Sequence, residues 1–169
     1  MPPSLSPAEE LKHVLVYTDG ACQGNPGPGC WAAVMVYGDK RREMSGGFRR
    51  TTNNRMELMG AIEALKAMRY PCAVTLTTDS EYLKKSIELG WARKWKSNNW
   101  MRQGERVPNS DLWIELLGLL DVHKVTIVWV RGHTGHPENE RCDKLAVVAS
   151  RAPELPEDAG YHPAAKAKR

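Results

Sequence analysis

The stretch that most constrains the fold is a short apolar run, residues 14–19, followed at once by a loop rich in glycine and proline, residues 20–29. β-Branched residues dominate the run, which is typical of a strand buried on both faces. The loop after it has too many glycines and prolines to be a regular element. Open α/β sheets place their ligands beyond the carboxyl ends of such strands, so Asp19, at the end of the run, is expected at a functional site.

Length and composition place the chain among single-domain globular proteins. It has 169 residues and a formal net charge of +4, which fits a polyanionic partner without proving one. Its four cysteines show no paired spacing, and residues 1–10 lack an apolar signal region, so we expect reduced thiols and a cytoplasmic location. No apolar run approaches the roughly 20 residues that span a bilayer, so no membrane partner is expected.

The first half of the chain predicts a meander followed by a crossover. Residues 30–38 and 41–48 read as two more strands, joined by a tight turn. Capping side chains at 51–54 then begin a helix whose apolar positions repeat with helical period up to Met68. A fourth strand, 73–78, ends at an aspartate, and the strand–helix–strand passage implies that it lies parallel to the first strand.

The second half predicts two more helices and one more strand. A short helix follows Ser80, another spans residues 111–120, a strand spans 125–130, and Pro137 begins the last helix. We therefore expect an α/β fold with a five-stranded mixed sheet, three antiparallel strands followed by two parallel ones, flanked by helices. The expected domain boundaries are a disordered lead at 1–12, one folded domain at 13–151 and a flexible tail at 152–169.

Four acids lie at element ends that could converge: Asp19, Glu57, Asp79 and Asp143. Each alone has an ordinary explanation, as a turn former, a first-turn helix acid or a solvated side chain. Together they would repel one another unless a cation neutralised them. Oxygen ligands suit Mg²⁺ or Mn²⁺, and two such ions can activate water for phosphodiester hydrolysis.

Residues 90–109 form a distinct segment in which tryptophans alternate with lysines and arginines. The tryptophans could be core anchors beside a solvated basic face. A basic, tryptophan-rich protrusion could equally supply phosphate contacts and an apolar groove wall for nucleic acid. Both uses are compatible, with the aromatic rings packed and the basic groups facing outward.

Several ordered motifs resemble type 1 ribonuclease H of the bacterial kind, from about residue 12 to about residue 149. They are residues 19–20, 24–29, 52–58, 78–80, 111–113 and 132–143. The resemblance implies the ribonuclease H fold, and an endonuclease that cuts the RNA strand of RNA–DNA hybrids and leaves 5′-phosphate and 3′-hydroxyl ends. It implies two Mg²⁺ ions, with Mn²⁺ as a possible substitute, and cellular work on RNA primers and other RNA paired with the genome.

The resemblance also assigns residues. Asp19, Glu57, Asp79 and Asp143 would be the metal-binding catalytic carboxylates, and His133 a proton shuttle. The basic segment would be a handle for the DNA strand, and Arg50, Thr52 and Asn109 a pocket for a DNA phosphate. The implied substrate-binding residues are Cys22, Gly24, Asn25, Arg50, Thr52, Asn53, Asn54, Trp91, Lys94, Trp95, Lys96 and Asn109. Glu81 departs from the glutamine expected there.

Three other interpretations stay open at this point. A DNA-acting nuclease of the same fold would carry similar acids, and a catalytically weak hybrid-binding module would keep the groove without cutting. A zinc site at His133, His136 and Cys142 is disfavoured because no second ligand pair has the usual spacing.

No partner helix or apolar seam is evident in the sequence, so a monomer is expected.

Overall fold

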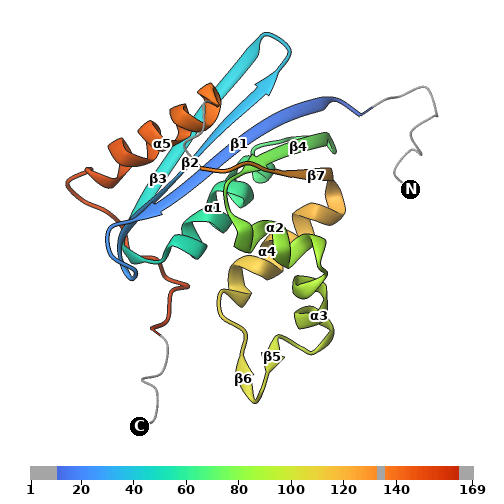
Figure 1. Ribbon diagram of the computed structural model, residues 1–169, viewed down its shortest axis with the longest axis vertical. Helices are drawn as coiled ribbons and strands as arrows, with labels where there is room; N and C mark the ends of the chain where they lie inside the picture. Colours follow the sequence, from blue (N-terminus) through green and yellow to red (C-terminus); the bar gives the residue numbers. More distant parts are fainter. Residues whose placement is uncertain (1–10, 133–135, 164–169) are drawn as a thin grey trace.

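The structure, a computed structural model, describes residues 11–132 and 136–163. Figure 1 shows a twisted sheet with helices on both faces, and its strand order is β3-β2-β1-β4-β7. β1 pairs antiparallel with β2 and β2 with β3, whereas β1–β4 and β4–β7 are parallel, which confirms the predicted mixed sheet. The strands are β1 (His13–Cys22), β2 (Gly27–Tyr37), β3 (Lys40–Thr51), β4 (Ala73–Thr78) and β7 (Lys124–Trp129).

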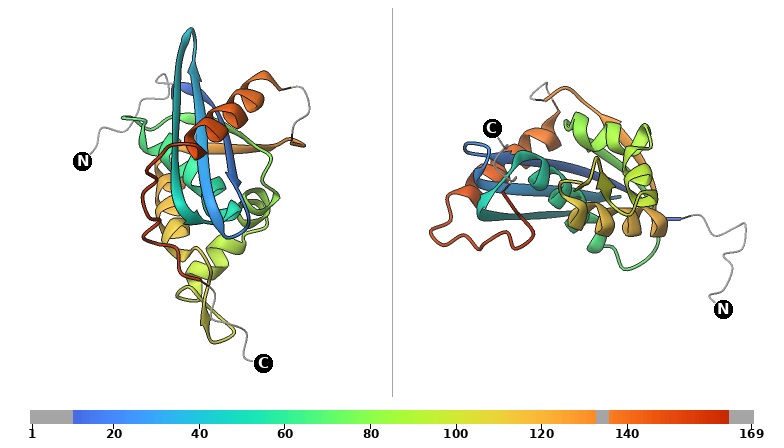
Figure 2. Two further views of the ribbon diagram at one scale, coloured as in Figure 1. Left: turned by 90° about the vertical axis from the view of Figure 1, so that its left-hand side faces the viewer. Right: turned by 90° about the horizontal axis from the view of Figure 1, so that it is seen from below.

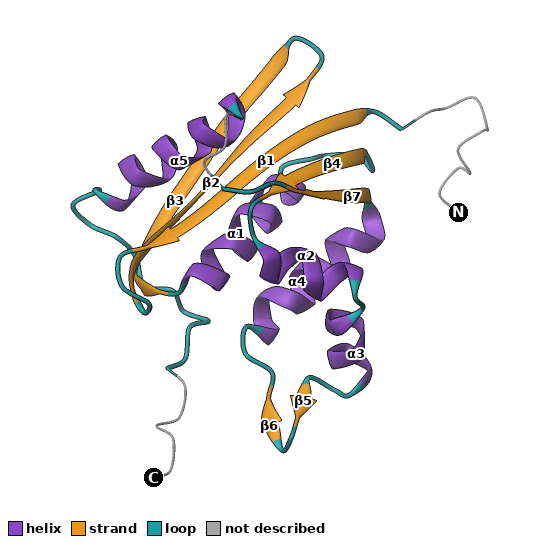
Figure 3. Cartoon of the chain, viewed as in Figure 1, coloured by secondary structure: helices purple, strands orange, loops and turns teal. Residues whose placement is uncertain are grey.

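The helices form a layer on each side of the sheet, as the secondary-structure colouring of Figure 3 makes plain. α1, α2 and α4 share one apolar core with the sheet, and α5 packs against β1, β2 and β3 on the opposite face. The two layers are seen from the side in Figure 2. The helices are α1 (Asn53–Lys66), α2 (Glu81–Glu88), α3 (Trp91–Ser97), α4 (Ser110–Val122) and α5 (Pro137–Ser150).

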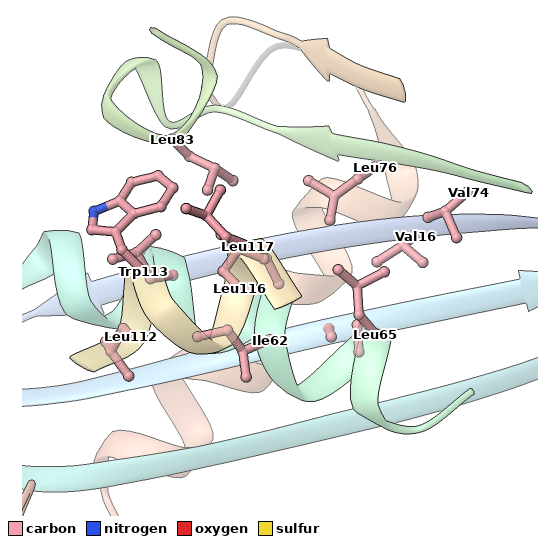
Figure 4. Packing of buried hydrophobic residues seen from close by; sticks show 14 of the residues in the cluster. Val16, Ile62, Leu65, Val74, Leu76, Leu83, Leu112, Trp113, Leu116 and Leu117 are labelled. Atoms are coloured by element: carbon pink, nitrogen blue, oxygen red, sulfur yellow. The ribbon is translucent and has the colours of Figure 1, made fainter. Parts of the chain in front are cut away.

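The larger core lies between the sheet and α1, α2 and α4 (Figure 4). Ile62 and Leu65 of α1 are fully buried against Val16 of β1, and Trp113 of α4 is fully buried beside them. Burying a side chain of this size stabilises the fold by roughly 1.5–3 kcal/mol. This core fixes α1 against the end of β1, where the candidate site lies.

The first strand differs from its prediction in two ways. It continues through the start of the glycine-rich stretch, because Ala21 and Cys22 pair with β2. Its outer face is also incompletely covered, since α5 packs over β1–β3 and leaves Leu15 38 % exposed. The glycine-rich loop is therefore shorter than expected, and Asp19 lies within the paired strand.

The basic segment contains more regular structure than its sequence predicts. It forms α3 and a small hairpin of β5 (Met101–Arg102) and β6 (Glu105–Arg106), which project away from the sheet in Figure 1. The ring of Trp95 packs edge-on against Trp113, with centroids 5.9 Å apart. The basic side chains of α3 are exposed, so the protrusion is anchored by an aromatic contact and presents charge outward.

The C-terminal segment also departs from its prediction. Of the tail expected to be flexible, residues 155–161 lie along the body, and the side chain of Asp158 is only 4 % exposed. It accepts hydrogen bonds from Thr51 and Arg55, both buried. The polar composition of the segment predicts that it is solvated. Instead, the buried Arg55 forms an ion pair with Asp158, a partner that the local sequence does not reveal. Of the predicted disordered lead, residues 1–10 lie outside the described residues.

Candidate active site

Three of the four predicted acids meet at one edge of the sheet. Asp19 lies on β1 and Asp79 directly follows β4, and because these strands are parallel their ends share an edge. Asp143, on α5, reaches the same place from the opposite layer. All three line a small cavity of about 10 Å³, together with Arg131, His136, Asn139 and Glu140.

Glu57 joins the group because α1 lies very close to the end of β1. A Cβ atom at Gly20 would lie 2.5 Å from the backbone nitrogen of Glu57, so only glycine permits this approach. The carboxylate of Glu57 accepts a hydrogen bond from the hydroxyl of Ser80. Ser80 in turn caps α2, with its oxygen 3.0 Å from the backbone nitrogen of Leu83. Asp19, Glu57, Asp79 and Asp143 are called the acid cluster below.

Burial and the charges of neighbouring acids make two members of the acid cluster, Asp19 and Glu57, hard to ionise. Burial, and after it the charges of Asp79 and Asp143, raise the pKa of Asp19 to about 7. Burial also raises the pKa of Glu57 to about 7, although the Ser80 hydrogen bond opposes the shift. A bound cation would remove this penalty, since it favours the charged form of every carboxylate around it.

Asp143 is held in place by the helix that carries it. Neighbouring Cys142 is buried against the sheet, and its thiol donates to the backbone oxygen of Tyr17 at 3.2 Å. Burial raises the pKa of the Cys142 thiol to about 12. This residue therefore packs α5 onto β1, with its thiol engaged by the backbone of β1.

The donor set of the acid cluster fits an oxygen-preferring cation. The Oδ1 atom of Asn139 is buried with no hydrogen-bond partner among the described residues, and Asn139 lines the acid cavity together with three of the acids. A cation or a cation-bound water in this cavity would give such an acceptor oxygen a partner. In the described part of the chain, no three acid, histidine or cysteine side chains already enclose a metal position. The cluster is thus an open set of oxygens.

Asn139 was not singled out from the sequence, although a signal for it exists. It precedes Asp143 by four residues, and side chains four apart share one face of a helix. His133, the predicted proton shuttle, lies outside the described residues, whereas His136 lines the acid cavity.

A wide groove lies beside the acid cluster, between the body and the protrusion. Its volume is about 620 Å³, and we call it the tryptophan groove. Of the predicted substrate-binding residues, those that line it are Asn54, Trp91, Lys94, Trp95 and Asn109. Tyr82, which sequence reasoning missed, also lines it, and its hydroxyl accepts hydrogen bonds from Trp113 and Asn109. Lys96 does not line the groove.

The remaining predicted residues surround the first loop and the start of α1. The Asn25 side-chain oxygen accepts from the backbone nitrogen of Asn53 at 3.2 Å, which joins the loop to the helix. The Asn25–Pro26 peptide is cis. The thiol of Cys22 lies 3.3 Å from the backbone oxygen of Thr51. Gly24 has a positive φ of 75°, and Glu81 faces solvent beside Lys85.

Arg50 and Thr52 bracket the end of β3. Thr52 caps α1, with its hydroxyl oxygen 3.3 Å from the backbone nitrogen of Arg55, and Arg50 is exposed. Asn109 lies at the start of α4 with a positive φ of 63°. Arg55 donates to its side-chain oxygen at 3.5 Å, so the two regions are joined.

Comparison with known proteins places this site in a family. The family model for RNase H matches residues 11–151. A ribonuclease H of Rippkaea orientalis is 56 % identical over 151 residues, covering 89 % of this chain and 93 % of the relative. One from Desulforamulus reducens is 55 % identical over 149 residues, covering 88 % and 94 %.

Among solved structures, the chain is similar to LC9-RNase H1, described as a type 1 RNase H with the type 2 active-site motif. The TM-score is 0.76 at 33 % identity, covering 86 % of this chain and 74 % of that one. The residues that the family model matches, 11–151, include the whole five-stranded sheet and the helices that carry Glu57 and Asp143.

Proposed function

Since the chain belongs to the ribonuclease H family of enzymes, we propose that it hydrolyses the RNA strand of RNA–DNA hybrids with two divalent cations. The meeting of acids from β1, β4 and α5 in one cavity, with Glu57 of α1 beside them, carries the proposal. Attack of water on the phosphorus displaces the 3′ oxygen, which leaves a 5′-phosphate and a 3′-hydroxyl end.

Asp19, Glu57, Asp79 and Asp143 would hold the cations, with Asn139 as a further neutral oxygen. When bound, two Mg²⁺ ions supply activation of the attacking water and stabilisation of the leaving oxygen. Asp19 lies on the central strand, and the charges of all three other acids raise its pKa, so it would contribute a carboxylate at the centre of the group that holds the cations. Ser80 orients Glu57 and favours its charged form.

The tryptophan groove would hold the DNA strand. It lies beside the acid cluster because α1 carries Asn54 in its wall and Glu57 one turn later. Lys94 offers a phosphate contact, and Trp91 and Trp95 form an apolar wall for sugars and bases. The 2′-hydroxyls of the RNA strand would meet the loop at Cys22–Asn25, whose backbone groups can donate and accept.

Other predictions stay as they are. The part of the chain that the structure describes holds no helix long and apolar enough to cross a membrane. A cytoplasmic location, a monomeric state and work on RNA primers remain predictions from the sequence. So does the proton-shuttle role of His133.

The test is a gel assay on labelled RNA paired with DNA, in Mg²⁺ or EDTA, beside matched RNA–RNA and DNA–DNA duplexes. We expect magnesium-dependent cutting of the RNA strand of the hybrid alone, and none by the Asp19→Asn protein. Binding without cutting would replace the proposal with the hybrid-binding module. Cutting of DNA would keep the fold and change the substrate.

A further inference from the structure

The starting observation is a buried arginine whose hydrogen bonds are all used. The side chain of Arg55 is 2 % exposed. It donates to both oxygens of Asp111 at 2.9 and 2.8 Å, to both oxygens of Asp158 at 2.7 and 3.0 Å, and to Asn109 at 3.5 Å. A guanidinium has five N–H groups, so each has an acceptor. Loss of either acid would leave buried donors unpaired.

Asp158 belongs to a segment that lies across the body, residues 155–161, which we call the C-terminal strap. The Oδ2 atom of Asp158 also accepts a hydrogen bond from the hydroxyl of Thr51 at 2.7 Å. The backbone nitrogen of Arg49 donates to the carbonyl of Pro156 at 2.8 Å. At Gly160 a Cβ atom would lie 2.0 Å from Oδ2 of Asp111, so the strap backbone lies directly against the ion pair.

The attachment points of the strap are next in sequence, or hydrogen-bonded, to the residues of the predicted phosphate pocket. Contacts at Arg49 and Thr51 lie on either side of Arg50, and contacts at Thr51 and Arg55 lie on either side of Thr52. The third pocket residue, Asn109, is reached through Arg55. Each of the three pocket residues is therefore either next in sequence to a residue that the strap contacts or hydrogen-bonded to one.

We propose that Asp158, acting through Arg55 and Thr51, is a positioning residue for the DNA-phosphate pocket of Arg50, Thr52 and Asn109. The proposal rests on the proposed function for the identity of the substrate. Asp158 itself touches no substrate. Its role is to keep two separate stretches of chain, the end of β3 and the start of α4, at one spacing that suits a phosphate group.

The effect should fall on binding rather than on the chemical step. The acid cluster has its own supports, the Ser80–Glu57 hydrogen bond and the Cys142–Tyr17 contact, and neither involves the strap. Of the three pocket residues, Asn109 is the one whose side chain is hydrogen-bonded to Arg55, and its amide nitrogen also donates to Tyr82. When Arg55 loses a partner, we expect Asn109 to be the pocket residue that shifts.

The experiment compares Asp158→Asn with Glu157→Gln. Both remove one negative charge from adjacent positions, but Glu157 is 80 % exposed and pairs only with the exposed Arg49 among the described residues. Steady-state cleavage of a hybrid gives KM and kcat, and fluorescence anisotropy in EDTA gives hybrid affinity from 50 to 300 mM salt. Circular dichroism checks that each variant is folded.

For Asp158→Asn we expect KM to rise roughly tenfold with kcat within about twofold. The plot of log affinity against log salt should become less steep by about 1, the signature of one lost phosphate contact. Glu157→Gln should change neither quantity. A merely structural role would lower thermal stability without changing the salt slope.

Unchanged KM and salt slope in a folded Asp158→Asn protein would overturn the inference and leave the proposed function intact. If the wild type fails to cut, the proposed function falls, and anisotropy still tests the strap. Should Asp158→Asn not fold, Thr51→Val removes one contact and keeps the Arg55 pair, with KM expected to rise about threefold. No change in that variant also overturns the inference.

Discussion

Asp19 and Glu57 carry the clearest mark of function at the scale of single residues. Burial and neighbouring acids raise the pKa of each to about 7, so the cation-free protein holds them at a cost. Carboxylates that are buried where they resist ionisation lower the stability of the fold. The cation that they would bind explains why they lie there. Ser80 partly offsets the cost at Glu57.

Asp19→Asn should abolish cleavage and stabilise the cation-free protein at high pH. A raised folded-state pKa gives stability that is present below about pH 4 and lost as pH rises through about 7. The amide avoids that loss, so in EDTA at pH 8 the variant should be more stable by ~4 kcal/mol, with little difference at pH 4. Chemical denaturation at both pH values measures this. A gain equal at both would contradict the assignment of the shift to Asp19.

Ser80→Ala should weaken cation binding. Without the hydroxyl, the pKa of Glu57 rises further and its carboxylate loses its fixed orientation. We expect the Mg²⁺ concentration for half-maximal cleavage to rise about fivefold, and the loss of the α2 cap to cost ~1 kcal/mol of stability. Ser80→Thr keeps both hydrogen bonds and should behave as wild type. The prediction fails if the alanine variant keeps its magnesium dependence.

At the scale of elements, the site depends on how closely β1 meets α1. Hydrophobic periodicity predicts both, because Leu58, Ala61 and Ile62 recur with helical spacing and are buried in the structure. Periodicity cannot predict α3 and the hairpin after it, since these elements are short and are held by contacts with residues distant in sequence, such as those of Trp95 with Trp113 and of Arg93 with Asp121. It also cannot predict the strap, because an ion pair between distant residues leaves no local pattern.

Gly20→Ala tests the contact between β1 and α1. The new methyl group would lie 2.5 Å from the backbone of Glu57, so the strand or the helix must move. We expect a loss of ~3 kcal/mol in stability and at least a 100-fold loss of cleavage. Gly118→Ala is the control, because nothing lies within 4 Å of its Cβ position in α4, and it should stabilise by ~0.5 kcal/mol. Equal effects of the two changes, measured by thermal unfolding, would refute the idea.

At the scale of the whole molecule, the proposed catalytic and binding sites lie on parts of one framework. The four acids come from both layers and two strands, and the tryptophan groove is built by the protrusion and the starts of α1 and α4. Sequence motifs identify the acids because each lies in a long ordered pattern. The sequence does not single out Asn139 and Tyr82, because neither carries a charge and their place in the site depends on the residues that surround them.

Lys94→Ala tests where nucleic acid binds. Lys94 lines the groove, whereas Lys124 begins β7 away from it and is equally exposed. Removing the groove lysine should weaken hybrid binding about threefold at 100 mM salt and make the salt dependence less steep. Lys124→Ala should change affinity little in the same anisotropy assay. Equal losses would mean that only overall charge matters.

The order of the chain has a consequence for the timing of synthesis. Asp19 lies on β1, whereas Asp143 lies on α5 and Asp158 follows that helix. The strand that carries Asp19 is therefore made well before the helix that carries Asp143. The proposed acid cluster can be completed only after α5 has emerged from the ribosome and docked on the sheet, and the contact of Asp158 with Arg55 forms later still.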